Sequence, residues 1–425
     1  MRKVSICILI ILALVPGLVA CGQPVAGEVV QSDKQRETSP DVNEIDLVTL
    51  IDGNSAFAFD LYQAVREKDS NLFYSPYSIS IALAMTYAGA HGETSQQMAD
   101  TLHFLLSQDR LHPAFNALDL ELARRGEGAE GKDGEGFRLN VVNAIWGQKD
   151  YNFLPKFLDT LAWNYGAGLR ILDFASAPEE SRITINKWVS DQTEGRIENL
   201  IPQGLINALT RLVLTNAIYF NAAWDHPFEE DTTHEGLFYL LDGGKIGVPM
   251  MKQTESFGYT EDDGYQAVEL PYDGGELSMI ILLPQTHRFE AFEGSLDAQR
   301  VEDIVKALEP RRVTLTMPRF EFKSSFSLRQ TLAKMGMPVA FSGGADFSGM
   351  TGNRDLFIAD VVHKAFVSVD EAGTEAAAAT AVVMELTAVP GAPVELTIDH
   401  PFIFIICDIE TGAILFVGRV LSPGA

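Results

Sequence analysis

The residue types that could support catalysis or metal binding are present, but they are not arranged for either. Serine, histidine and aspartate all occur, yet no Gly-x-Ser-x-Gly motif would hold a nucleophilic serine on a sharp strand-to-helix turn. The eight histidines are scattered and form no His-x-x-x-His pair, and no Cys-x-x-Cys is present. Gly274-Gly275 and Gly343-Gly344 are typical of turns rather than of phosphate-binding loops. We therefore expect neither an enzyme nor a site for a metal or cofactor.

The stretch from Val367 to Pro390, VSVDEAGTEAAAATAVVMELTAVP, suggests a different kind of chemistry. Valines alternate with polar residues in its first part, as in a strand, and Gly373 follows. From Thr374 to Ala381 the residues are small, apart from Glu375. An alanine-rich run also favours a helix, but the strand before it and the prolines after it favour an extended segment. Side chains this small could pass between two existing strands without a steric clash.

The elements that must position this stretch mix helices and strands without a regular βαβ alternation, which predicts an α+β fold. A helix is expected from about Asn54, and Ser75-Pro76 is a typical helix start, because serine caps free N–H groups and proline suits the first turn. Strands are expected over residues 139–146 and 313–322, and a longer strand run with a bend over 212–228. Residues 356–364 lead into the stretch itself.

These segments resemble the serpin family. VDEAGTEAAAAT resembles its hinge, and His400-Pro401-Phe402 with residues 412–423 resembles its C-terminal strands. Residues 71–104, Asn186-Lys187-Trp188-Val189 and 212–228 are further matches. The resemblance covers nearly all of residues 45–425 and implies a single α+β domain. That domain would have a large central mixed or antiparallel sheet, further sheets, surrounding helices and an exposed reactive-centre loop.

The resemblance also assigns roles to individual residues. A hinge comprises Glu371, Gly373, Thr374, Glu375, Ala376, Ala377, Ala378, Ala379 and Thr380. A polar cluster beneath the main sheet, the shutter, comprises Ser75, Ser78, Asn216 and His363. The point where insertion would start, the breach, comprises Trp224, Arg319 and Glu371.

The function implied is inhibition of a serine protease, or alternatively a cysteine protease, by a suicide mechanism. The protease would cleave the loop and remain attached as an acyl-enzyme while the hinge inserts into the sheet. The family's spacing from Gly373 places the cleaved bond between Thr387 and Ala388, with Leu386 as the neighbouring candidate. Residues 382–394 contain no lysine or arginine, which favours an elastase-, subtilisin- or chymotrypsin-like target over a trypsin-like one.

The N-terminus predicts export and a lipid anchor. Arg2 and Lys3 precede an apolar run that ends at Ala20, and Cys21 follows. We interpret residues 1–20 as a lipoprotein signal peptide, Cys21 as the lipidated residue, and the polar residues 21–44 as a flexible tether. The protein would then face outward on the cell membrane or envelope. Cys407 would be the one remaining cysteine, so no intrachain disulfide is expected.

The net charge of −26 argues against nucleic acid as a partner. We expect a monomer. Two other functions remain open at this point: a serpin that no longer inhibits and serves as a carrier or structural protein, and a lipid-anchored solute-binding protein. The first would be favoured by proline or bulky charge between Thr374 and Ala381, and the second requires two lobes with a pocket between them.

Overall fold

The computed structural model describes residues 27–66, 70–126, 138–374 and 392–424. The helices are α1 (Glu44–Val65), α2 (Pro76–Tyr87), α3 (Gly92–Leu102), α4 (Gln108–Leu122), α5 (Pro155–Tyr165), α6 (Pro178–Gln192), α7 (Phe289–Gly294), α8 (Ala298–Lys306), α9 (Arg329–Met335) and α10 (Ser348–Thr351), with 3-10 turns η1 (Glu230–Thr232) and η2 (Val339–Phe341). The strands are β1 (Glu28–Val30), β2 (Leu72–Tyr74), β3 (Arg138–Gln148), β4 (Leu169–Leu172), β5 (Leu212–Ala223), β6 (His234–Tyr239), β7 (Lys245–Glu261), β8 (Tyr265–Pro271), β9 (Leu277–Pro284), β10 (Glu309–Pro318), β11 (Phe320–Ser327), β12 (Asp360–Val369), β13 (Gly373–Thr374), β14 (Val394–Thr397), β15 (Phe402–Asp408) and β16 (Ile414–Val420).

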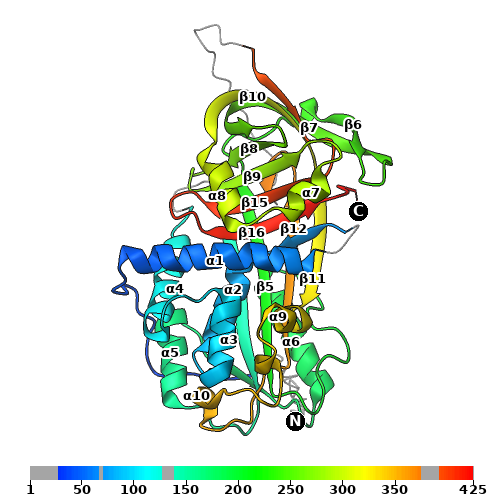
Figure 1. Cartoon of the computed structure of the whole chain (residues 1–425). Coiled ribbons are helices and arrows are strands. Elements are labelled where there is room, and N and C mark those ends of the chain that lie inside the picture. The colour runs from blue at the N-terminus through cyan, green and yellow to red at the C-terminus, as the bar shows by residue number, and fades with distance from the viewer. Residues whose placement is uncertain (1–26, 67–69, 127–137, 375–391, 425) are drawn as a thin grey trace, which may run out of the picture.

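The central sheet has the strand order β1-β4-β3-β5-β13-β12-β11. Its two long middle strands, β5 and β12, run parallel and pair directly from Val213 opposite Asp360 to Tyr219 opposite Phe366. Their outer neighbours β3 and β11 are antiparallel to them. The sheet is therefore mixed, and β5 and β12 run along the long dimension of the molecule (Figure 1).

A second sheet has the order β14-β10-β7-β8-β9-β15-β16-β2, with β6 paired to β7. The strands β6, β7 and β10 lie at one end of the molecule, the upper end in Figure 1. Helix α2 contacts β3 and β5 of the central sheet and β16 of the second sheet, so it lies between them. Its residues are all buried, which explains why no charged residue occurs on any of its faces.

The predicted α+β class is confirmed, and so is the predicted start of α2. The Ser75 hydroxyl accepts a hydrogen bond of 3.1 Å from the Ser78 amide and caps the helix. The first helix is longer than predicted, because it begins at Glu44 after an Asn43 cap rather than near Asn54. Asn54 lies inside the helix, where its side-chain oxygen accepts a hydrogen bond from the Ser80 hydroxyl.

Part of the predicted tether is instead built into the domain. The sequence was expected to be flexible from residue 21 to 44, but Glu28–Val30 forms β1 and pairs antiparallel with the edge strand β4. Farther along, Arg36 donates to Asn116 (2.8 Å) and pairs with Asp119 (2.6 Å) on α4, and the Glu37 amide donates to the Trp163 carbonyl on α5. We call residues 27–43 the N-terminal strap. Val30 and Val42 are its only hydrophobic residues packed against the core among the described residues, and its other contacts are polar, so no hydrophobic period marked it in the sequence.

We predict that Arg36→Ala destabilises the protein by about 2 kcal/mol, because it removes two hydrogen bonds from a largely buried guanidinium, one of them to a carboxylate. Lys34→Ala is the matched control, since Lys34 makes an exposed ion pair with Asp159 that should contribute less than about 1 kcal/mol. Urea unfolding of the two variants beside the parent chain measures both effects. An Arg36→Ala midpoint no lower than that of Lys34→Ala would show that the strap is only loosely attached.

Candidate functional site

The hinge turns back on itself at the end of β12. After Val369 the chain makes a tight turn in which the Asp370 carboxylate accepts hydrogen bonds from the amides of Ala372 (2.8 Å) and Gly373 (3.2 Å). Gly373 and Thr374 then form β13, which pairs antiparallel with β5 on one side and with Val369 of β12 on the other. The first two residues of the predicted inserting segment thus already lie between β5 and β12.

Gly373 is required by the close approach of β13 to β5. Its φ angle is +156°, and a β-carbon at this position would lie 2.2 Å from the carbonyl oxygen of Ala222. Every other residue would therefore clash with the backbone of β5. This explains in physical terms why glycine opens the small-residue run.

Thr374 is anchored by an aromatic pair. It is fully buried, and its hydroxyl lies 2.9 Å from the hydroxyl of Tyr272. The Tyr272 ring stacks on Trp224 with centroids 4.7 Å apart and planes 9° apart. Trp224 in turn donates from its ring nitrogen to the Asp370 carbonyl (3.0 Å) and from its amide to the Ala372 carbonyl (2.9 Å). The predicted breach tryptophan therefore holds both ends of the hinge turn.

Glu371 is the charged member of the breach, and the structure brings it to Arg319 as predicted. The carboxylate is almost fully buried and accepts hydrogen bonds from the Arg319 guanidinium (2.7 Å from Nε) and from the Thr233 hydroxyl (2.5 Å). Burial alone would raise the pKa of Glu371, but the hydrogen bonds from Arg319 and Thr233 outweigh it and lower this pKa below its usual value. Glu371 is thus a charged, fully partnered latch, whereas Arg319 keeps part of its guanidinium in solvent.

The predicted shutter residues also meet. Asn143, Asn216 and His363 occupy one row across β3, β5 and β12, because Asn216 lies opposite both other residues in the sheet. The Asn216 side-chain oxygen bonds to Nδ1 of His363, and its amide nitrogen donates to Asn143 and to the Ser78 hydroxyl. The Ser75 amide lies 3.4 Å from Nε2 of His363. A single polar network therefore joins the two middle strands to the start of α2.

This network carries no charge. Burial lowers the pKa of His363 to about 3, because an imidazolium would lose its hydration there. The pattern of partners places the proton of the neutral ring on Nδ1, which donates to Asn216, and leaves Nε2 to accept from Ser75. The ring of Phe326 on β11 stacks parallel to the imidazole at 6.0 Å. The shutter can therefore exchange partners without moving a charge.

Sequence reasoning missed three members of the site, Asn143, Tyr272 and Thr233. Asn143 was detectable, since it interrupts the apolar residues Val141 and Ile145 on the inward face of β3. Tyr272 and Thr233 gave no signal, because their roles depend on contacts made across the fold. The predicted hinge residues from Glu375 to Thr380, the predicted bond residues Leu386, Thr387 and Ala388, and Cys21 lie outside the described residues.

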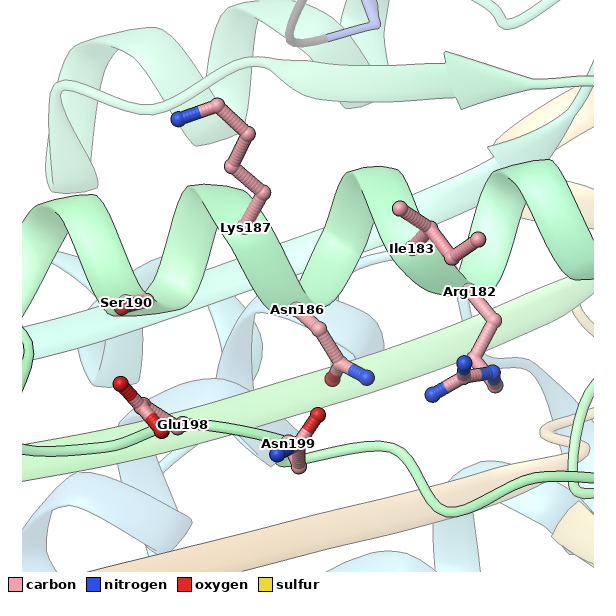
Figure 2. Close-up of a pocket in the computed structure, with 7 residues that line it drawn as sticks. All are labelled: Arg182, Ile183, Asn186, Lys187, Ser190, Glu198 and Asn199. Atoms are coloured by element: carbon pink, nitrogen blue, oxygen red, sulfur yellow. The ribbon is translucent and has the colours of Figure 1, made fainter.

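The described residues offer little for small-molecule or metal chemistry. A pocket of about 260 Å³ lies between α6 and the segment around Asn199 (Figure 2). Arg182 and Asn186 point toward that segment and bond to the Ile201 backbone, whereas Lys187 points away and pairs with Asp191. No group of three or more potential metal ligands occurs in the described part of the chain. Within the same residues, none of the helices has the length and apolar character needed to cross a membrane.

We predict that the shutter makes stability depend on pH. The pKa of His363 is about 3 in the folded chain against about 6.5 when unfolded, so the unfolded state binds the extra proton below pH 6.5. Stability is therefore complete above pH 6.5 and falls with acidification, by about 2 kcal/mol between pH 6.5 and 5. His363→Gln removes this component and should flatten the pH dependence. Urea unfolding of the parent chain and of His363→Gln at pH 7 and pH 5 measures this pH dependence. His112→Gln is measured beside them, because burial also lowers the pKa of His112, to about 4, and this second histidine contributes to the slope of the parent chain. Equal slopes for the parent chain and His363→Gln would contradict the assignment.

Comparisons with known proteins agree with this geometry. A family model described as "Serpin (serine protease inhibitor)" matches residues 52–423. The chain is 42% identical over 392 residues to an uncharacterized serpin-like protein of Thermococcus kodakarensis, covering 92% of this chain and 87% of that protein. It is 41% identical over 386 residues to leukocyte elastase inhibitor A of Rattus norvegicus, covering 88% and 99%.

Solved structures give the same result. The native state of the thermophilic serpin tengpin superposes with a TM-score of 0.80 at 27% identity, covering 92% of this chain and 97% of that one. Uncleaved ovalbumin gives a TM-score of 0.78 at 26% identity, covering 88% and 100%. The matched family model spans most of the chain, the fold contains the predicted central sheet, and the residues predicted for the shutter and for the breach lie together in it. The chain therefore belongs to the serpin family.

Proposed function

We propose that this protein inhibits a serine-type endopeptidase as a suicide substrate, by inserting its cleaved loop into the central sheet. The observation that carries the proposal is β13, which already lies between β5 and β12 at the end of the sheet where the loop begins. Beyond β13, β5 and β12 pair directly with each other from Tyr219 opposite Phe366 to Val213 opposite Asp360, so the path for an entering strand runs between them from the end of β13. The protein supplies the cleaved bond, and the catalytic residues belong to the protease.

The register of β13 defines how the cleaved loop would enter. Gly373 lies opposite Ala223 and Thr374 opposite Ala222, so an extension in the same register places Met384 opposite Leu212, where β5 begins. Because Thr374 faces the core, even-numbered residues as far as Met384 would face inward and odd-numbered residues outward. The inward set, from Thr374 through Ala376, Ala378, Thr380 and Val382 to Met384, is uncharged, and Glu375 falls on the outward face.

This register brings Thr380 to the shutter. Asn216 of β5 and His363 of β12 would both lie opposite residue 380, by counting from either neighbour of β13. An inserted strand increases the spacing between β5 and β12 from about 4.8 Å to about 9.6 Å, which breaks the Asn216–His363 hydrogen bond. The Thr380 hydroxyl can accept from His363 and donate to Asn216, so both groups keep a partner after insertion. Asn216 also retains Ser78 and Asn143.

The chemistry of trapping follows from ordinary acyl transfer. The protease serine oxygen attacks the carbonyl carbon of Thr387, the bond to Ala388 breaks, and the proton goes to the departing amine. Insertion then competes with hydrolysis of the acyl-enzyme. Each new strand hydrogen bond contributes about 0.5–1.5 kcal/mol, so insertion of the ten residues from Glu375 to Met384 releases on the order of 10 kcal/mol. The uncut state is then metastable and persists because of a kinetic barrier.

The loop sequence supports an elastase-, subtilisin- or chymotrypsin-like target, since no lysine or arginine lies near Thr387. The similarity to several proteins named leukocyte elastase inhibitor supports the elastase-like class in particular.

We predict a covalent complex with a serine protease that survives denaturation. The chain is mixed with elastase, subtilisin, chymotrypsin and trypsin, and the products are separated on a denaturing gel. Mass spectrometry of the released C-terminal peptide should show that it begins at Ala388, or within two residues of it. Cleavage by every protease without a covalent band, and with full residual protease activity, would overturn inhibition and favour a carrier role.

The proposed register makes a second prediction. Thr380→Arg should convert the inhibitor into a substrate, because insertion would bury an unpaired guanidinium beside neutral His363 at a cost of several kcal/mol. Glu375→Arg is the matched control, since the same side chain would face outward near Ser368, which is partly exposed. The ratio of covalent complex to cleaved protein on the gel measures the difference. Similar ratios for the two variants would mean that the register is wrong.

A further inference from the structure

The N-terminal strap enters the domain at the end of the sheet opposite the hinge. Glu28 of β1 lies opposite Ile171 of β4, which lies opposite Gly147 of β3, which lies opposite Leu212 at the start of β5. This row is one end of the central sheet, and we call it the anchor pole. The hinge lies at the other end of β5, where Gly373 pairs with Ala223.

The two poles are far apart. Eleven residues separate Leu212 from Ala223 along β5, which corresponds to about 36 Å. Figure 1 shows β5 running along the long dimension of the molecule. Phe153 packs against Gly147, and the amide of the next residue, Leu154, donates to the Met350 carbonyl of α10. In Figure 1, α10 lies at the lower end of the molecule, whereas β6 and β10 lie at the upper end.

The strap is attached firmly enough to fix this geometry. Gly168 allows the close approach of Val29 and Gln31, because a β-carbon there would lie 2.8 Å from each of their side chains. The Ser32 hydroxyl donates to Asp159 (2.5 Å), and Arg36 bonds to α4. The point at which the chain joins the body is therefore set by contacts with β4, α5 and α4.

The chain between Cys21 and Gly27 is short. Six peptide steps span at most about 20 Å, whatever conformation they adopt. A lipid on Cys21, as the sequence predicts, would therefore hold Gly27 within about 20 Å of the bilayer surface. A tether reaching to residue 44, as the sequence alone suggested, would have imposed no such limit.

We propose that the anchor pole faces a lipid bilayer at close range and that the reactive loop is presented at the membrane-distal end. The occupant of this face is the membrane itself, held by the lipid rather than by charge, since the acidic chain gains nothing from an anionic surface.

One consequence rests on the proposed inhibitory function. In the register of β13, Thr387 lies three residues beyond Met384, so insertion carries the attached protease to the anchor pole. A protease of about 200 residues is about 40 Å across, twice the gap that the anchor allows. Trapping on a membrane therefore requires the domain to tilt, and it should be slower than trapping in solution.

Fluorescence energy transfer to the bilayer tests the orientation directly. The full chain, processed and lipidated, is placed in phosphatidylcholine vesicles that contain an acceptor-labelled lipid. A donor dye is attached either to Lys149→Cys at the anchor pole or to Glu235→Cys near the hinge. Glu235 lies two residues from Thr233, whose hydroxyl donates to Glu371. The native side chains at both positions are exposed. The native Cys407 should not react, because it is buried and burial raises its pKa to about 12.

We expect transfer from position 149 to exceed transfer from position 235 severalfold. Equal or reversed transfer would overturn the proposal, and so would failure of the processed chain to bind vesicles. A variant with about 20 glycine and serine residues inserted after Gly22 is the matched control, and it should lose most of the difference between the two positions.

Trapping assays separate this inference from the proposed function. The Cys21→Ser chain, produced without residues 1–20 so that it carries neither the apolar signal nor a lipid, reports inhibition alone in solution. On vesicles, the long-linker variant should form covalent complex several times faster than the parent chain, while the two should be equal once detergent releases them. If Cys21→Ser traps a protease but linker length has no effect on vesicles, the close-range membrane arrangement is wrong and inhibition stands. If Cys21→Ser fails to trap while the transfer contrast persists, the orientation stands and the inhibitory function is wrong.

Discussion

The pairing of β5 with β12 is the constraint on which the rest of the structure depends. These parallel strands meet directly along most of their length, yet at one end they already admit β13 between them. Their contact includes the buried side-chain hydrogen bond between Asn216 and His363, within a network that contains no charge. An apolar contact at this row would have no group able to exchange partners, and a buried ion pair would be costly to separate. A neutral hydrogen-bonded row closes the sheet and can still be opened.

The hinge is held by a different kind of interaction. Glu371 is a buried carboxylate with a guanidinium and a hydroxyl as partners, and Trp224 and Tyr272 pack against the turn beside it. Here charge and aromatic stacking fix one geometry, which keeps Thr374 in place before any cleavage. The insertion path therefore depends on two kinds of interaction. A charged and aromatic contact holds the hinge rigidly where the loop starts, whereas neutral hydrogen bonds that can change partners join β5 and β12 where these strands must separate.

The sequence was sufficient for the fold class and for the residues that meet at the shutter and breach. Those residues could be predicted because the segments that contain them resemble the serpin family, which assigns the roles position by position; composition alone indicated only the glycine before the alanine run and the serine and proline at the start of α2. Tyr272 and Thr233 could not be predicted, because an isolated tyrosine or threonine acquires a role only when the fold brings it to the hinge. The N-terminal strap was misjudged for a related reason. Polar residues such as Arg36 look like solvated chain until Asn116 and Asp119 are known to lie beside them.

The short strand β13 also affects the order of events after cleavage. Starting a new strand is entropically unfavourable, because a free chain end must first find the correct neighbours and register. Here Gly373 and Thr374 are already paired with β5 and β12 before the loop is cut, so the neighbours and the register of the new strand are set in advance. In the proposed mechanism the remaining residues only extend a strand whose first two residues are already paired. Its speed is then set by how readily Asn216 and His363 separate, and not by how quickly the loop finds the gap.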